Sequence, residues 1–311
     1  MENVIKVADR IRRLEIQGAS NVALAAVEAL VEEMKSSKAP NRETAIAEIE
    51  EARRILFSSR ETEPFMRNAI RFIEWGVRQA QWTSIQELHE LVQKFSDELL
   101  DGFRRARTSI ADIGARRISP GDTILTHCHS STVNMVFKRA RELGADFEVF
   151  VTETRPVYQG RITAKELMDF GIKTTMIVDS AARAFMKRID SVVVGADAIT
   201  SEGNVVNKIG TSLIALSSHE ARTPFYVVTE LLKFDPQTIH GDYEAIEERP
   251  RDEIWQEAPP GLTVRNPAFD VTRRDYIHGI VCEEGIISPH SILEAVLRRY
   301  PWILKYTELR P

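Results

Sequence analysis

The sequence is poor in cysteine and contains no long apolar run, and these two absences exclude several classes of protein. Cys128 and Cys282 are the only cysteines among 311 residues, too few for the disulfide framework of a small secreted protein. No stretch of 18 apolar residues occurs, so the sequence predicts no membrane-spanning helix. The first 18 residues lack the uninterrupted apolar segment of a secretory signal peptide. We therefore expect a soluble, cytoplasmic protein.

Basic residues are not in excess, and the common zinc motifs are missing. The formal net charge is −5, so the chain as a whole offers no basic surface to nucleic acid. Neither a CxxC nor an HExxH pattern occurs, and zinc needs several ligands at such spacings. Accordingly, we expect no metal, no cofactor, no nucleic-acid partner and no membrane partner.

Two halves of the chain have different patterns. Before about residue 115, apolar residues recur every three or four positions, for example from Val22 to Met34 and from Ala47 to Leu56, which predicts amphipathic helices. Segments 61–78 and 84–114 show the same spacing. We predict an N-terminal helical domain over residues 1–118 and a second domain over residues 119–311.

Short β-branched runs alternate with amphipathic stretches in the second half, which predicts an α/β fold with a parallel sheet and helices packed around it. The expected strands are Thr123–His127, Phe147–Thr152, Thr174–Val178, Ser191–Val194 and Phe225–Val228. The expected helices cover 131–143, 163–170, 181–188, 207–219 and 290–299. Ligands of such folds bind beyond the carboxyl ends of the strands, so the residues after each strand are the candidates for a site.

Polar and reactive side chains follow these strands. In chain order, the segments after the strands are HCHSST, TETRPVYQGR, VDSAAR, GADAITSEGNVVNKIGT and TELLKF. Polar loops are common in any protein, but a carboxylate as close to an apolar strand as Asp197 is costly to bury. We interpret this edge of the sheet as an active site.

Cys128 lies between two histidines, and this HCH segment has three alternative readings: a metal cluster, a reactive thiol or a core cysteine. A metal cluster is disfavoured because adjacent side chains on a strand point to opposite faces. We interpret His127 and His129 as hydrogen-bonded supporting residues. Cys282, which has no such polar neighbours, is predicted to be a core residue.

A helix start is predicted directly after Cys128, at Ser130, Ser131 and Thr132. Hydroxyl side chains cap the free N–H groups of such a helix end, and its positive dipole binds anions such as phosphate. The same field would lower the pKa of the Cys128 thiol and favour the thiolate.

Further candidates follow the fourth and fifth strands. Burial would raise the pKa of Asp197 and hold it partly protonated, which suits an acid or a base. Asn207 and Lys208 are expected to begin the next helix, and Lys233 follows the fifth strand. Both lysines suit phosphate as point charges.

A second group of candidates lies in the helical half. Gln17, Gly18, Ala19 and Ser20 lead into a helix, where glycine allows close approach and free N–H groups are placed to bind a second phosphate. An ordinary helix cap is the alternative. Arg60 is a further candidate for the same ligand.

Taken together, five ordered motifs resemble those of one family: THCHSST, ETRPVYQGRITAKEL, VVGADAITSEGNVVNKIGTSLIAL, IEERPRDEI and NPAFDVT. The family joins the regulatory alpha, beta and delta subunits of eukaryotic translation initiation factor 2B to two sugar-phosphate isomerases. These are methylthioribose-1-phosphate isomerase and the archaeal ribose-1,5-bisphosphate isomerase. The resemblance covers almost the whole chain and implies that the second domain is a Rossmann-like catalytic domain.

The resemblance also implies an activity. The isomerases of the family carry a cysteine after the first strand and an aspartate in the GAD motif, which Cys128 and Asp197 match, whereas the regulatory subunits generally lack this pair. HCHSS, NKIGT and TELLKF are more similar to the ribose-1,5-bisphosphate enzyme. The implied reaction converts α-D-ribose 1,5-bisphosphate to D-ribulose 1,5-bisphosphate and feeds AMP-derived ribose toward Rubisco. In the expected path, Asp197 donates a proton to the ring oxygen and the Cys128 thiolate removes the C2 proton to give a phosphoenolate, although the sequence leaves open which residue is the acid and which the base.

By the same resemblance, substrate contacts are expected at Gln17, Gly18, Ala19, Ser20, Arg60, Ser130, Ser131, Thr132, Asn207, Lys208 and Lys233. Hexamers built from dimers and activation by AMP are also expected. One departure is QGAS, where relatives often have an arginine before the glycine, so the role of Gln17 is open. Three alternatives remain: a methylthioribose-1-phosphate isomerase, a non-catalytic regulatory subunit that binds a translation factor, and a sensor of nucleotides or sugar phosphates.

Overall fold

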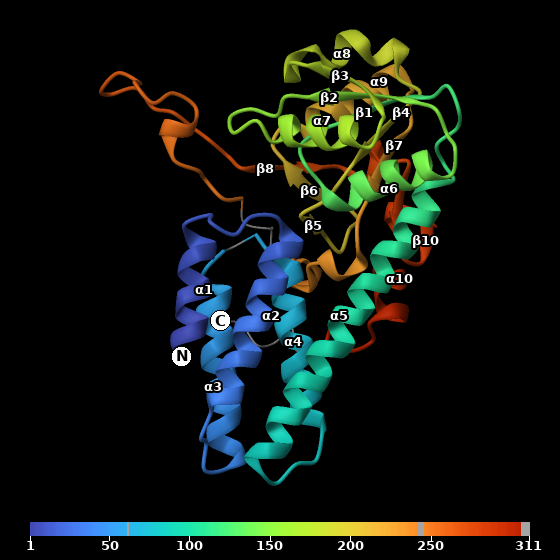
Figure 1. Cartoon of the computed structure of the whole chain (residues 1–311). Helices are drawn as coiled ribbons and strands as arrows, with labels where there is room; N and C mark the ends of the chain where they lie inside the picture. Colours follow the sequence, from blue (N-terminus) through green and yellow to red (C-terminus); the bar gives the residue numbers. More distant parts are fainter. Residues whose placement is uncertain (61, 242–245, 306–311) are drawn as a thin grey trace.

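In the computed structural model, which describes residues 1–60, 62–241 and 246–305, a helical bundle precedes the first strand. The bundle lies at one end of the molecule and the sheet at the other (Figure 1). The helices of the bundle are α1 (Glu2–Arg12), α2 (Ala19–Ser36), α3 (Arg42–Phe57), α4 (Pro64–Gln79) and α5 (Ile85–Ala115). The predicted helical segments are therefore confirmed, although residue 61, with which one of them was expected to begin, lies outside the described residues.

Local sequence explains where two of these helices begin. Pro64 occupies the first turn of α4, where its missing N–H costs nothing. Ser84 and Glu87 form a capping box that starts α5, each side chain accepting a backbone N–H of the other. At 31 residues, α5 is roughly 46 Å long and runs from the bundle to the sheet (Figure 1).

The main sheet has the strand order β10-β9-β7-β4-β1-β2-β3. Its strands are β1 (Thr123–Thr126), β2 (Glu148–Thr152), β3 (Lys173–Ile177), β4 (Ser191–Val194), β7 (Phe225–Val228), β9 (Gly279–Cys282) and β10 (Gly285–Ile287). All neighbours pair in parallel except β10, which runs antiparallel to β9. The five predicted strands are confirmed to within one residue. Between β1 and β4 the order of the strands reverses, and such a switch point opens a crevice for ligands.

Both faces of this sheet are covered, because its strands alternate apolar side chains toward the two sides. Ile124 and Val149 belong to a core with α6 (Ser131–Glu142), α7 (Gln159–Asp169) and the end of α5. Leu125 and Phe150 face the other core, with α8 (Ala182–Phe185) and α9 (Thr211–Ala221). The fold is thus the predicted α/β class, with helices on both faces of a mostly parallel sheet.

A small second sheet corrects one prediction. β5 (Ala198–Ile199), β6 (Val205–Lys208) and β8 (Phe269–Thr272) pair antiparallel, so Asn207 and Lys208 end a strand and do not begin a helix. The helix starts at Thr211 because Gly210 breaks the chain direction with a φ of 102°. Asp270 of β8 accepts the N–H of Gly210 at 2.8 Å, which ties the two segments together.

The bundle and the sheet share contacts. Asn68 of α4 donates to the carbonyl oxygens of Leu232 and Phe234, at 2.8 and 2.7 Å. Trp302, which follows α10 (Ile292–Arg299), packs on Phe72 with ring centroids 5.2 Å apart. One apolar cluster continues from the bundle to one face of the sheet, so the division into domains at residue 118 stays a prediction. None of the described helices has the length and apolar character needed to cross a membrane.

Candidate active site

A cavity of about 740 Å³ lies beyond the carboxyl ends of β1 and β4, where the bundle meets the sheet. Every residue predicted for the site lines it: Gln17, Gly18, Ala19, Ser20, Arg60, Cys128, Ser130, Ser131, Thr132, Asp197, Asn207, Lys208 and Lys233. The fold therefore brings both halves of the chain to one place, while the role of each residue stays a prediction.

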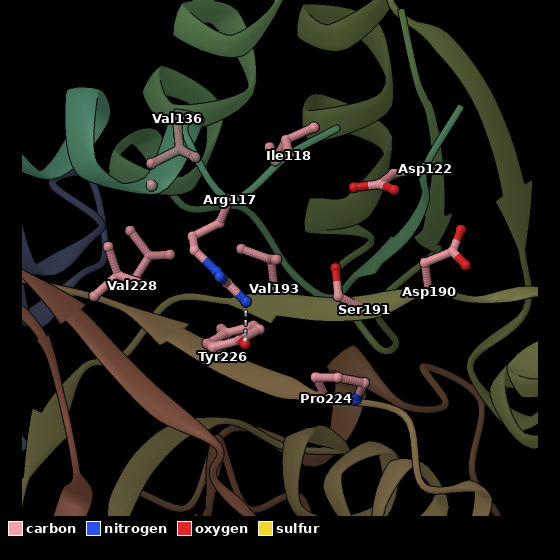
Figure 2. A pocket seen from close by; sticks show the side chains of 12 residues that line it. Arg117, Ile118, Asp122, Val136, Asp190, Ser191, Val193, Pro224, Tyr226 and Val228 are labelled. Atoms are coloured by element: carbon pink, nitrogen blue, oxygen red, sulfur yellow. Dashed lines mark hydrogen bonds between the residues drawn. The ribbon is translucent and has the colours of Figure 1, made fainter. Parts of the chain in front are cut away.

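A smaller cavity of about 150 Å³ lies elsewhere, by the amino ends of β1, β4 and β7 (Figure 2). There the Arg117 guanidinium lies over the ring of Tyr226 and donates to its hydroxyl at 2.8 Å. Asp190 accepts the N–H of Thr123 at 2.8 Å. These polar groups are occupied in holding the loops, so we assign no chemistry to this cavity.

Cys128 occupies the turn between β1 and α6 in an unusual backbone conformation. Its φ is 68°, a left-handed value that costs on the order of 1–3 kcal/mol for a residue other than glycine. Its N–H donates to the Thr154 hydroxyl at 2.9 Å, and its carbonyl oxygen accepts from the Thr163 hydroxyl at 2.8 Å. Hydrogen bonds on both sides therefore hold the turn that presents the thiol to the cavity.

The two flanking histidines are hydrogen-bonded, as predicted, although His129 also lines the cavity. His127 is buried, with Nε2 2.9 Å from the Ile209 carbonyl and Nδ1 2.6 Å from the Thr152 hydroxyl. Because a carbonyl only accepts, Nε2 carries the hydrogen and Nδ1 accepts from threonine. Burial lowers the pKa of His127 and keeps the ring neutral. His129 Nδ1 lies 3.1 Å from the Thr163 hydroxyl.

Across the described ranges, no group of three or more His, Cys, Asp or Glu side chains is arranged to hold a metal ion.

The prediction of a lowered pKa for the Cys128 thiol is contradicted. Burial raises its pKa to about 12, and Lys208 is the group that opposes this rise most strongly. The expected lowering by the helix end is wrong, because the desolvation of the thiolate outweighs the field of α6, although Cys128 keeps some exposure where it lines the cavity. The raised pKa favours the neutral thiol of Cys128 at physiological pH.

Asp197 behaves as predicted. Burial raises its pKa, while Lys233, Arg60 and Lys208 lower it. Gly195, two residues earlier, allows the close approach on which the site depends: a Cβ there would lie 2.7 Å from the Ser130 hydroxyl. Only glycine lets the end of β4 pack against the start of α6, and this contact brings Asp197 to the same cavity as Cys128.

Two helix ends face the cavity. Ser130 caps α6 by accepting the N–H of Val133 at 3.4 Å. Gly18, with a φ of 83°, precedes α2, and no side chain caps that helix. Uncapped N–H groups at a positive helix end favour an anion, which supports the phosphate reading of this loop. The Thr132 hydroxyl, in contrast, already donates to Glu230 at 2.8 Å.

Positive charge dominates the cavity wall. Five cations line it, Arg60, Arg107, Lys208, Lys233 and Arg249, against the carboxylates Glu15, Asp197 and Glu253. Three of the cations have acidic partners: Arg60 with Glu63 at 2.8 Å, Lys233 with Glu230 at 3.3 Å and Arg249 with Glu253 at 2.7 Å. Lys208 and Arg107 form no ion pair within the part of the chain that the structure describes, so their charge is available to a ligand.

Sequence reasoning missed Arg107 and Arg249. Arg107 lies on α5 with its guanidinium 5.5 Å from the Phe103 ring, and in the sequence it is one of many cations on an amphipathic helix. Arg249 belongs to the IEERPRDEI motif, so its motif was recognised but its place at the cavity was not.

Glu63, fully buried beside Arg60, provides a test of these electrostatics. Burial raises its pKa from 4.5 to about 7, so the folded state holds this proton more tightly than the unfolded state. The contribution of this shift to the free energy of unfolding is fully present below about pH 4.5. It is lost, by roughly 3 kcal/mol, as pH rises through 7. Between pH 5 and pH 8, the free energy of unfolding should decrease in both proteins by different amounts. The decrease in Glu63→Gln should be smaller than that in the wild type by roughly 2–3 kcal/mol.

Chemical denaturation at the two pH values measures this difference. The exposed Glu32→Gln provides the control and should retain the wild-type pH dependence. Parallel pH dependence in Glu63→Gln and the wild type would contradict the assignment.

Similar proteins are known. The Initiation factor 2 subunit family matches residues 15–289. A ribose 1,5-bisphosphate isomerase of Thermococcus kodakarensis is 40% identical over 318 residues, which cover 99% of this chain and 98% of that protein. One of Archaeoglobus fulgidus is 42% identical over 301 residues, 96% of this chain and 94% of that protein. The crystal structure of a Pyrococcus horikoshii translation initiation factor eIF-2B is also similar, with a TM-score of 0.81, 32% identity and coverage of 93% and 98%.

Proposed function

The chain belongs to the Initiation factor 2 subunit family, and from this premise we propose that it is a ribose-1,5-bisphosphate isomerase. The enzyme is an aldose-ketose isomerase, an intramolecular oxidoreductase, that converts α-D-ribose 1,5-bisphosphate to D-ribulose 1,5-bisphosphate. One observation carries the proposal: Cys128 and Asp197, on separate strand ends, line one cavity in which positive charge is in excess. The full-length similarity to archaeal isomerases of this name supports it.

Two phosphates fit this cavity better than one. The start of α6 and the uncapped start of α2 offer separate anion sites, and Lys208 and Arg107, which form no ion pair within the described residues, add positive charge. A methylthioribose-1-phosphate isomerase would need an apolar pocket in place of one of these sites. Val157 and Ile162, exposed apolar side chains on the cavity wall, are the residues that favour this second candidate.

The reaction needs two linked pairs of proton transfers. The phosphate at C1 blocks opening of the sugar to a free aldehyde, so the ring C1–O bond must break as C2 loses its proton. An acid protonates the ring oxygen, a base removes the C2 proton, and a C1=C2 enol phosphate forms. The base then returns its proton to C1, while the C2 hydroxyl gives its proton to the former acid and becomes the ketone. Both residues end in the form in which they began.

The protons balance whichever of the two residues is the acid, but the two assignments start from different protonation states. With Asp197 as acid and Cys128 as base, the cycle starts from a thiolate. With Cys128 as acid and Asp197 as base, it starts from a thiol, the form that the raised pKa of Cys128 favours in the free enzyme. We propose the second order. The raised pKa of Asp197 also makes its carboxylate a stronger base.

A direct assay tests the activity. Purified protein is incubated with α-D-ribose 1,5-bisphosphate, with and without AMP, and ribulose 1,5-bisphosphate is measured. Methylthioribose 1-phosphate and buffer alone are run in parallel. We expect turnover of the bisphosphate with a kcat/KM at least 100-fold above that of the methylthio substrate. The methylthio substrate has no second phosphate, so the groups that bind this phosphate would have no partner in its complex. Turnover of the methylthio substrate alone would favour the second candidate, and turnover of neither would contradict both.

The remaining expectations concern assembly and metabolism. We propose that the enzyme is a homo-oligomer, a hexamer of three dimers, that AMP activates it, and that its product feeds AMP-derived ribose to Rubisco in an archaeal cytoplasm. The resemblance between the motifs supports these points. Light scattering tests the assembly, which a monomer would contradict, and the isomerase assay with and without AMP tests the activation, which equal rates would contradict.

A further inference from the structure

We propose that Thr154, held in place by Asp179, is a positioning residue that directs the Cys128 thiol into the cavity. The inference rests on the proposed function in one respect, that Cys128 takes part in catalysis. Thr154 itself is fully buried and does not line the cavity as Cys128 does, so it acts through the cysteine.

The first step is the contact between the two residues. β1 ends at Thr126, so the N–H of Cys128 has no neighbouring strand to pair with. It donates to the Thr154 hydroxyl at 2.9 Å. That hydroxyl donates in turn to the carbonyl oxygen of Thr152 at 3.3 Å, which leaves its lone pairs for the Cys128 N–H. The buried hydroxyl therefore determines the orientation of the peptide group between His127 and Cys128.

The second step is the conformation of Thr154. Its φ is 62°, a left-handed value that is exceptional for a β-branched residue. Asp179, which follows β3, accepts the N–H of Thr154 through Oδ1 and the N–H of Arg155 through Oδ2, both at 2.7 Å. Short hydrogen bonds to a carboxylate are among the stronger ones in proteins, so Asp179 fixes an otherwise unfavourable backbone.

These contacts form one continuous brace across the sheet. Asp179 lies at the end of β3, Thr154 at the end of β2 and Cys128 at the end of β1, and these three strands are neighbours in that order. Two left-handed residues, Cys128 and Thr154, are thereby fixed against each other. Displacing a reacting group by about 1 Å can cost on the order of 100-fold in rate, so a brace of this kind is expected to act on turnover.

Two substitutions at Thr154 separate positioning from folding. Thr154→Val keeps the shape but removes the acceptor, and we expect kcat to fall about 10- to 100-fold while KM stays within about threefold. Thr154→Ser restores the hydroxyl and should recover kcat to within about threefold of the wild type. Thr174→Val is the control, because the Thr174 hydroxyl donates to the carbonyl oxygen of Ile172, the residue before β3, and its kcat should be unchanged.

Alkylation provides a readout that does not depend on the substrate. The rate at which iodoacetamide modifies Cys128 is followed by mass spectrometry, with the buried Cys282 as internal reference. We expect this rate to change at least threefold in Thr154→Val and Asp179→Asn, and to return to the wild-type value in Thr154→Ser, since exposure and direction of the thiol control its access. If Thr154→Val does not fold, Asp179→Asn carries the same comparison.

The outcomes separate this proposal from the proposed function. No isomerase activity in the wild type, together with altered alkylation in the variants, refutes the function and supports the positioning role. Equal kcat and equal alkylation in Thr154→Val and the wild type overturn the positioning role, as does a loss in Thr154→Ser as large as that in Thr154→Val. A merely structural role would lower the melting temperature and leave both readouts of the folded protein unchanged.

Discussion

Replacing Cys128 by serine is expected to lower kcat by about three orders of magnitude or more and to leave KM within about threefold. The hydroxyl keeps the shape of the side chain but binds its proton far more tightly than a thiol. It is therefore a poor acid, and too little of it is ionised for it to act as a base. The proposed substrate contacts lie mainly at other residues that line the cavity, which is why binding should persist.

Steady-state kinetics with ribose 1,5-bisphosphate measure this loss, and calorimetric titration with the product measures binding. Cys282→Ser is the matched control: Cys282 is buried in β9, away from the cavity, so its substitution should change stability and not kcat. A Cys128→Ser enzyme that retains more than a tenth of the wild-type kcat would show that the thiol has no role in proton transfer.

The second large effect is expected at Asp197. Asp197→Asn is nearly isosteric but cannot exchange a proton, and we expect kcat to fall by about two to four orders of magnitude. Asp190→Asn is the control, because Asp190 is an exposed carboxylate at the opposite edge of the sheet, and its kcat should stay within about twofold. Loss of substrate binding with unchanged kcat in Asp197→Asn would assign this carboxylate to binding instead.

The pH profile of kcat/KM tests whether ionisation of Asp197 controls the activity. If Asp197 is the base, as proposed, its carboxylate must be ionised, so activity falls as pH decreases through its raised pKa. The opposite order gives a profile of the same shape, because the fraction of enzyme with a protonated Asp197 and an ionised Cys128 changes at the same two pKa values. An acidic limb that remains after correction for substrate ionisation and is lost in Asp197→Asn supports the titrating role of Asp197, and the same limb in both enzymes contradicts it.

Much of the fold follows from short-range patterns. The strands β1, β4 and β7 were predicted to within one residue, because each is an uninterrupted apolar run with β-branched residues. Their carboxyl ends then indicated the site, because parallel strands present these ends at one edge of a sheet. Cys128 and Asp197 could therefore be placed together from the sequence, although 69 residues separate them.

The prediction for Asn207 and Lys208 was wrong for a physical reason. Their segment was expected to be helical, but Asn207 pairs with Asp270 of β8, 63 residues later. The gain from that pairing is long-range and leaves no local signal, so tertiary contacts overrode the helical pattern that continues from Thr211 onward. Arg107 escaped notice for a related reason, since an arginine on a long helix has the same local pattern whether it faces solvent or a cavity.

The sequence by itself determined the α/β class, the strand ends that carry polar groups and the pairing of Cys128 with Asp197, because these depend on the order and polarity of neighbouring residues. Only the tertiary structure decided the pKa values of these groups and the direction in which their side chains point. Cys128 was expected as a thiolate, yet burial raises its pKa to about 12, and its backbone is set by Thr154 across the sheet. Desolvation and hydrogen-bond direction depend on everything that surrounds a group in space, and the chain supplies those surroundings only once it has folded.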